Sequence, residues 1–183
     1  MHYVELCSEV KDIYNKLRNP KQRIAELEGH GLLVADTSSK LRAYLHMLEG
    51  GVIKLDEKYI VLPFNEKVDY IKKTFGDTAD MVIMYQYIAE GIKLRQQFKN
   101  ALILQGTSYA EGVDLHKYKH LIIYSQDFST GRHTQRRARQ ANMNRSEPIQ
   151  VHFILVKGAI SARVYQTVSV NKKNFVDTVF GAI

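Results

Sequence analysis

The feature that most limits the fold of this chain is a set of short, unbroken apolar runs in its second half. Each run has the length of a strand, and the four are MVIMY at 81–85, ALIL at 101–104, HLIIY at 120–124 and VHFILV at 151–156. An unbroken apolar run is buried on both faces, which is typical of parallel strands covered by helices. Helical stretches at 88–99 and 159–168 alternate with the runs. This alternation predicts an α/β fold, with a doubly wound, mainly parallel sheet and helices on both faces.

The first half of the chain is expected to be mainly helical. The spacing of apolar residues predicts helices over four ranges, 4–17, 21–27, 37–48 and 65–75. Before the last of these, VIKLDEKYIVLP alternates around Asp56 and Glu57, which predicts a two-stranded ribbon. A chain of 183 residues can bury around 70% of its unfolded surface in one core. We therefore expect one domain over 1–183, with a helical lead-in at 1–50, a β-ribbon at 51–63 and an α/β core at 64–183.

The charge balance favours a polyanionic partner. The formal net charge is +7 and the isoelectric point is about 9.4, which steers the chain towards nucleic acid or nucleotide phosphates. The single cysteine, Cys7, excludes an internal disulfide and fits a reducing cytosol. No apolar run approaches the ~20 residues that span a bilayer. We expect an intracellular, cytoplasmic protein with no membrane partner.

The densest patch of charge is a run of five arginines between Arg132 and Arg145, in GRHTQRRARQANMNRSEP. No carboxylate interrupts the sequence from Phe128 to Ser146. Arginine stays ionised and offers a planar fork of donors that fits phosphate oxygens two at a time. The alternative is a solvent-facing helix without a specific role, but the lack of acidic partners argues against it. The run therefore predicts a phosphate-binding segment.

A second polar segment follows the strand ALIL. This segment, QGTSYAEGVDL at 105–115, supplies hydroxyls and backbone amides at Thr107 and Ser108, a close backbone approach at Gly112 and a carboxylate at Asp114. In a parallel sheet, ligands gather at the carboxyl ends of the strands, where this segment and the arginine run are both expected. An ordinary loop explains the polar segment alone about equally well.

Taken together in order and spacing, the two segments resemble a known family. The sequence from ALILQGTSYAEGVDL through TQRRARQ to VHFILVKGAISARVY resembles the second RecA-like lobe of superfamily-two helicases and translocases. It is most similar to the Swi/Snf-related branch, including phage and viral members. TSYAEGVDL occupies the place of helicase motif V, QRRAR that of motif VI, and MVIMYQYIAEGIKL that of motif IV. The resemblance is specific from about residue 80 onward.

The resemblance implies a role for each matching residue. Gln135 and Arg139 match the motif VI residues that face ATP across the cleft between two lobes, and Arg136 is a further candidate for catalysis. An arginine at this place stabilises charge on the transferring γ-phosphoryl group. The remaining roles fall to two sets of residues: Gly112, Asp114 and Arg139 on the nucleotide, and Thr107, Ser108 and Arg132 on the nucleic-acid backbone.

Two departures from the family pattern are visible. In an ungapped alignment the second motif VI arginine falls on Asn142, so either Arg145 or Arg136 reaches that place or the motor is weakened. In addition, no G-x-x-x-x-G-K-[ST] loop is present to hold phosphates and Mg²⁺. The chain is thus expected to supply half of an ATP site, with ATP and Mg²⁺ bound only together with a first RecA-like lobe.

The expected function is an ATP-driven helicase or translocase that acts on duplex DNA in a sequence-independent way. The alternative is a non-catalytic nucleic-acid-binding module that keeps the RecA-like fold, which Asn142 supports. A small-molecule enzyme is disfavoured because the chain has no G-x-G-x-x-G signature. No metal site is expected, since His116 and His120 lack a nearby third ligand.

Overall fold

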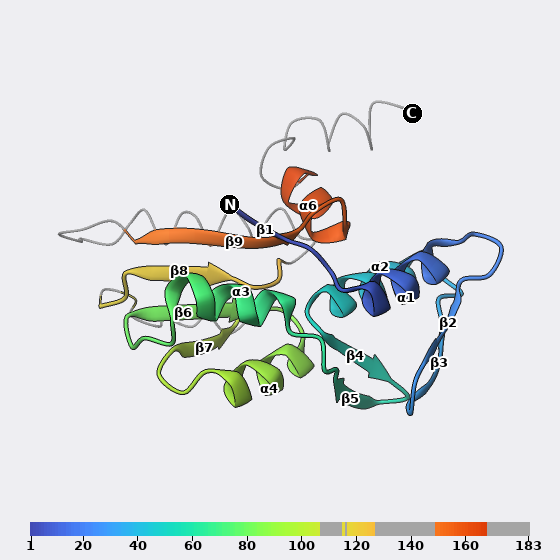
Figure 1. Ribbon diagram of the computed structural model, residues 1–183, viewed down its shortest axis with the longest axis horizontal. Helices are drawn as coiled ribbons and strands as arrows, with labels where there is room; N and C mark the ends of the chain where they lie inside the picture. Colours follow the sequence, from blue (N-terminus) through green and yellow to red (C-terminus); the bar gives the residue numbers. More distant parts are fainter. Residues whose placement is uncertain (107–114, 116, 127–148, 168–183) are drawn as a thin grey trace.

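The fold is described from a computed structural model, which covers residues 1–106, 115, 117–126 and 149–167. Its centre is a five-stranded sheet in the order β7-β6-β8-β9-β1 (Figure 1), and every pairing in this sheet is parallel. The strands of the sheet are β1 (His2–Val4), β6 (Met81–Tyr85), β7 (Leu102–Gln105), β8 (His120–Ile123) and β9 (Gln150–Val156). The expected α/β class with a mainly parallel sheet is confirmed.

Helices and two hairpins surround this sheet. The described helices are α1 (Ser8–Arg18), α2 (Ser38–Glu49), α3 (Glu66–Phe75), α4 (Ile88–Gln97) and α6 (Ile160–Tyr165). The hairpins are β2 (Ile24–Leu27) with β3 (Gly31–Val34), and β4 (Val52–Leu55) with β5 (Lys58–Val61). Figure 1 shows α1, α2 and both hairpins beyond the carboxyl ends of the sheet strands. Among the described helices, none is long and apolar enough to cross a membrane.

The burial of the central strand β6 explains why its sequence is apolar throughout. All five of its residues are buried, and successive residues point to opposite faces of the sheet. Met81, Ile83 and Tyr85 join the larger core, which α3 and α4 cover, whereas Val82 and Met84 join a smaller core with Leu115, Tyr118 and neighbouring strand residues. Burial on both faces therefore requires apolar residues at even and odd positions alike.

Local sequence signals account for several element ends. Thr37 caps α2, since its hydroxyl oxygen accepts a hydrogen bond from the backbone amide of Lys40 at 3.1 Å. The β4–β5 hairpin turns through Asp56 and Glu57, which both have positive φ angles, as a two-residue turn between twisted strands requires. The ribbon predicted over 51–63 and the helices predicted over 37–48 and 65–75 are confirmed.

Two expectations about the first fifty residues are wrong. The segment 21–27, expected to be a helix, instead leads into the β2–β3 hairpin, which buries Ala25, Leu27 and Leu33 on one face. The helix expected from residue 4 begins at Ser8, and the residues before it form β1, which pairs in parallel with β9. The segment 1–50 is therefore not only a helical lead-in, because it adds an edge strand to the sheet.

Candidate functional site

The order of the strands creates a switch point at the carboxyl edge of the sheet. From β6 the chain passes through α4 to β7 on one side, and the next strand, β8, pairs with β6 on the other side. Ligands of doubly wound sheets bind where the connections diverge in this way. The ends of the three strands are level, because Tyr85 pairs with Gln105 and Met84 pairs with Ile123.

Both segments that the sequence singles out follow from this edge. The first begins after Gly106, whose backbone amide donates to the carbonyl oxygen of Tyr85 at 2.7 Å. The second begins after Gln126, three residues beyond the end of β8. The predicted site residues themselves lie outside the described residues: Thr107, Ser108, Gly112, Asp114, Arg132, Gln135, Arg136 and Arg139, together with Asn142 and Arg145. Their roles stay predictions.

The described part of the edge is built around Glu90, a fully buried carboxylate in the first turn of α4. One of its oxygens, Oε2, accepts hydrogen bonds from the backbone amides of Gln86 and Tyr87 at 3.1 and 3.0 Å. The hydroxyl of Ser125 also donates to this oxygen, at 2.5 Å. Burial raises the pKa of Glu90, although these donors oppose the shift. Glu90 therefore joins the start of α4 to the ends of β6 and β8.

A buried lysine lies between this carboxylate and a second one. The Nζ atom of Lys67 donates to the carbonyl oxygen of Tyr124 at 2.8 Å, and it lies 5.3 Å from the centre of the Tyr124 ring. Burial lowers the pKa of Lys67, and the negative charges of Glu49 and Glu90 act in the opposite direction. The hydroxyl of Tyr124 in turn donates to the carbonyl oxygen of Gly50 at 2.7 Å. The end of β8 is thus tied to both α2 and α3.

Glu49 connects the same network to the segment that follows β9. Its carboxylate accepts hydrogen bonds from the backbone amides of Ile160 and Ser161, at 2.7 and 3.2 Å, and from the hydroxyl of Tyr14 at 3.1 Å. These amides begin α6 and have no partner within the helix. Burial raises the pKa of Glu49. The carboxylate fixes the start of α6 against α1 and α2.

The last buried charge at this end of the molecule is Lys93. Its ammonium group donates to the carbonyl oxygens of Gly51, Leu62 and Phe64. Burial lowers the pKa of Lys93 to about 8, so the group is mainly protonated at neutral pH and uses all three donors. Gly51 leaves room for it, since a Cβ atom at this position would lie 2.3 Å from Nζ. Lys93 therefore holds the β4–β5 hairpin on α4.

These groups position the edge and do not themselves form a catalytic set. Lys67 and Lys93 donate to backbone carbonyl groups. Glu49 and Glu90 accept from backbone amides and from the hydroxyls of Tyr14 and Ser125. Within the described ranges, no group of histidine, cysteine, aspartate or glutamate side chains has the arrangement of a metal site. His120, one of the two histidines considered for zinc, instead shares a hydrogen bond with His152 at 3.2 Å.

Sequence reasoning missed the whole buried network. Glu90 had a usable signal, because a glutamate three residues after a helix cap commonly bonds back to the cap amide. Glu49, Lys67 and Lys93 had none, since each occurs in a helix that also carries exposed charges. A buried charge of this kind is visible only when the packing around it is known.

Comparison with known proteins identifies the fold. No known family model matches the chain, and no curated protein sequence does. Among solved structures, the chain is similar to the C-terminal part of the Fun30 ATPase domain, with a TM-score of 0.58 and 11% sequence identity. The match covers 92% of this chain and 87% of that one. The chain therefore has an α/β, RecA-like fold, as expected from the resemblance.

Proposed function

We propose that this chain is the second motor lobe of an ATP-driven helicase or translocase that moves along DNA. The observation that carries the proposal is the position of the two predicted segments: both follow from the carboxyl edge of one RecA-like sheet, on either side of its switch point. Ligands of this class of sheet bind at that edge. A separate first lobe would bring the phosphate-binding loop and hold Mg²⁺, and the complete protein would act inside the cell.

In this proposal the two segments divide the work. Arg139, with Gln135 and Arg136, faces the γ-phosphate of ATP, and Gly112 and Asp114 lie on the nucleotide side. The DNA backbone contacts Thr107, Ser108 and Arg132. ATP would draw the two lobes together and hydrolysis would release them. Hydrogen bonds near the start of each segment support this division of work: Ser125, just before the second segment, donates to Glu90, and Gly106, just before the first, donates to Tyr85.

The experiment that tests the proposal is a steady-state ATPase assay of the protein with its first lobe, in the presence of duplex DNA. Arg139→Ala should lower kcat by ~10³ or more while leaving nucleotide affinity nearly unchanged, because the arginine acts on the transition state. Arg139→Lys should recover little of the activity, since lysine keeps the charge but loses the fork. Lys73→Ala, at an exposed position on α3, is the control. A wild-type rate for Arg139→Ala would refute the assignment.

A second candidate function is a nucleic-acid-binding module without a motor, which Asn142 favours. The two candidates differ in what Asn142→Arg does. If the motor is weakened at this position, the substitution should raise the ATPase rate of the two-lobe protein. A chain without motor function should show DNA binding and no ATP turnover in either form. The isolated chain should show no turnover under either proposal, because it lacks the phosphate-binding loop.

A further inference from the structure

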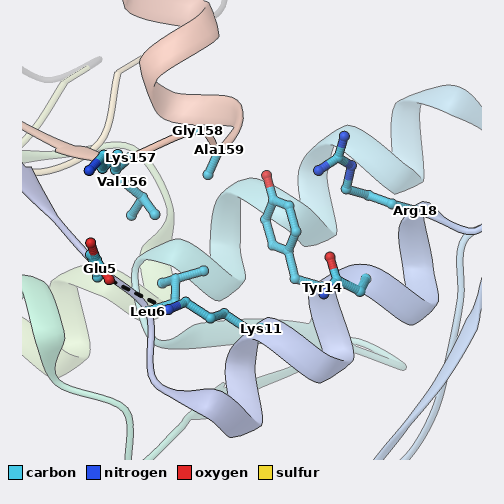
Figure 2. Close-up of a pocket in the computed structure, with 10 residues that line it drawn as sticks. Glu5, Leu6, Lys11, Tyr14, Arg18, Val156, Lys157, Gly158 and Ala159 are labelled. Atoms are coloured by element: carbon cyan, nitrogen blue, oxygen red, sulfur yellow. Dashed lines mark ion pairs between the residues drawn. The ribbon is translucent and has the colours of Figure 1, made fainter.

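A groove lined by residues outside both predicted segments runs along the seam of α1, α2 and α6. It consists of two adjoining hollows of about 320 and about 360 Å³, which share Tyr14, Arg18, Gly158 and Ala159 in their lining. Figure 2 shows the first hollow, in which Tyr14 and Arg18 extend from α1 on the side of Gly158 and Ala159. Each hollow has the size of a small ligand site. All of the lining residues lie in the described part of the chain.

The second hollow collects three arginines from three different helices. Arg18 comes from α1, Arg42 from α2 and Arg163 from α6, and no carboxylate is among the residues that line this hollow. All three side chains are exposed. Within the described residues none of the three forms an ion pair, whereas Lys11, which lines the first hollow, is paired with Glu5 at 3.6 Å. The three guanidinium groups are therefore available to an external anion.

The polar groups of the second hollow make an anion the fitting ligand. The rest of its lining includes Tyr14 and three aliphatic side chains, Leu41, Leu45 and Ile160. The hydroxyl of Tyr14 is already engaged, since it donates to Glu49 and accepts from the backbone amide of Ile160 at 2.8 Å. In the second hollow, the polar side chains that remain are the three arginines, which are all donors. A guanidinium group can donate two parallel hydrogen bonds to two phosphate oxygens. An anion between the three arginines would also relieve the repulsion between their positive charges.

The groove lies on the edge of the sheet that carries the proposed function. β1 and β9 are parallel to β6, and the residues that follow β1 and β9 lead into α1 and α6. The seam of α1, α2 and α6 is thus at the carboxyl side of the sheet, towards the β1 edge. A nucleic-acid backbone that crosses this side could contact the groove in addition to the segment after β7.

From these observations we infer that the arginine groove binds the phosphodiester backbone of nucleic acid, with Arg18, Arg42 and Arg163 as the contacting residues. The anion site follows from the convergence of the arginines. The choice of nucleic acid as the source of phosphate rests on the proposed function and on the net charge of +7. The groove extends the contact with the track beyond the residues of the motif V segment.

The test is the salt dependence of duplex DNA binding, measured by fluorescence anisotropy with the chain as it exists. Arg42→Gln/Arg163→Gln removes two contacts at exposed positions, so the fold should be kept. If each arginine neutralises one phosphate, the slope of log K against log salt should become shallower by about 1.8. The advantage of the wild type over this variant should then shrink by about 12-fold between 50 and 200 mM salt. Lys58→Gln/Lys73→Gln, which removes two exposed charges outside the groove, is the matched control.

The outcomes separate the inference from the proposed function. If the arginine variant binds duplex DNA as tightly as the wild type, and its salt slope equals that of the lysine control, the inference is overturned and the proposed function stays intact. A wild-type chain that binds no duplex at 50 mM salt would overturn both. Binding of a poly-glutamate peptide that is lost in the arginine variant, while DNA binding is kept, would assign the groove to an acidic protein segment and overturn the inference.

Discussion

Acidification should destabilise this protein in part through His46, a buried histidine in α2, and the size of this contribution can be calculated. His46 is fully buried, and its Nδ1 atom shares a hydrogen bond with the Tyr87 hydroxyl at 3.1 Å. Burial lowers the pKa of His46 to about 3, and the charge of Lys67 acts in the same direction. The unfolded chain has a histidine pKa near 6.5. Between these two values the unfolded state binds one more proton than the folded state at this position.

The sign and the size of the effect follow from this difference. The folded pKa is the lower of the two, so the contribution of His46 is fully present above about pH 6.5 and is lost as the pH falls towards 3. The loss is about 2 kcal/mol at pH 5 and about 3 kcal/mol at pH 4. A domain of this size has a total stability of roughly 5–15 kcal/mol, so His46 alone removes a substantial part of it.

The measurement is urea unfolding at several pH values, followed by far-ultraviolet circular dichroism because the chain has no tryptophan. His46→Phe cannot take up the proton, so its free energy of unfolding should fall less steeply than that of the wild type. The difference in slope should average about 1.3 kcal/mol per pH unit between pH 6 and 4. His46→Gln, which keeps a polar side chain near Tyr87, should show the same slope as His46→Phe. Equal slopes in the wild type and both variants would show that His46 is not desolvated.

Two further predictions concern the packing of α4. Lys93→Met should lower the free energy of unfolding by about 2–4 kcal/mol, because three carbonyl groups lose their shared donor; Lys73→Met at an exposed position is the control, and equal urea midpoints for the two variants would contradict the role of Lys93. Gly91→Ala should destabilise by about 1–3 kcal/mol in a thermal melt, although alanine is the better helix former, because its Cβ atom would lie 2.4 Å from the Tyr85 ring. In a chain that carries Tyr85→Leu, Gly91→Ala should lower the stability much less. A gain in stability for Gly91→Ala in the wild-type chain would refute the close contact.

The strands of the second half were predictable because one physical property determined them. β6 has no solvent-facing side, so its burial leaves an unbroken apolar run that few other structures produce. The segment 21–27 was not predictable in the same way. Its apolar residues fit a helix as well as a strand. The strand forms because the segment pairs with β3, as in the pair of Leu27 and Gly31. β1 is only three residues long, which is too short for any periodicity to show.

The candidate site was also predictable from the sequence only in part. Dense arginines and small polar residues are visible in the composition of the sequence itself, which therefore singled out 105–115 and 132–145. The groove arginines are spread over three helices and come together only in the folded chain. Each of them, taken alone in the sequence, looks like an ordinary exposed charge of a helix.

The buried network has a consequence for how such a lobe could work. Glu49, Lys67 and Glu90 are costly to bury, and a well-packed apolar core would often be at least as stable. The charged groups instead fix relative positions, because each hydrogen bond holds one strand or helix end at the carboxyl edge against another. If the chain serves an ATP site that is completed by a second lobe, its arginines must reach the γ-phosphate to within a fraction of an ångström whenever the lobes close. Under the proposed function, the hydrogen bonds of Glu90 to Gln86, Tyr87 and Ser125 would fix where the two predicted segments begin relative to each other.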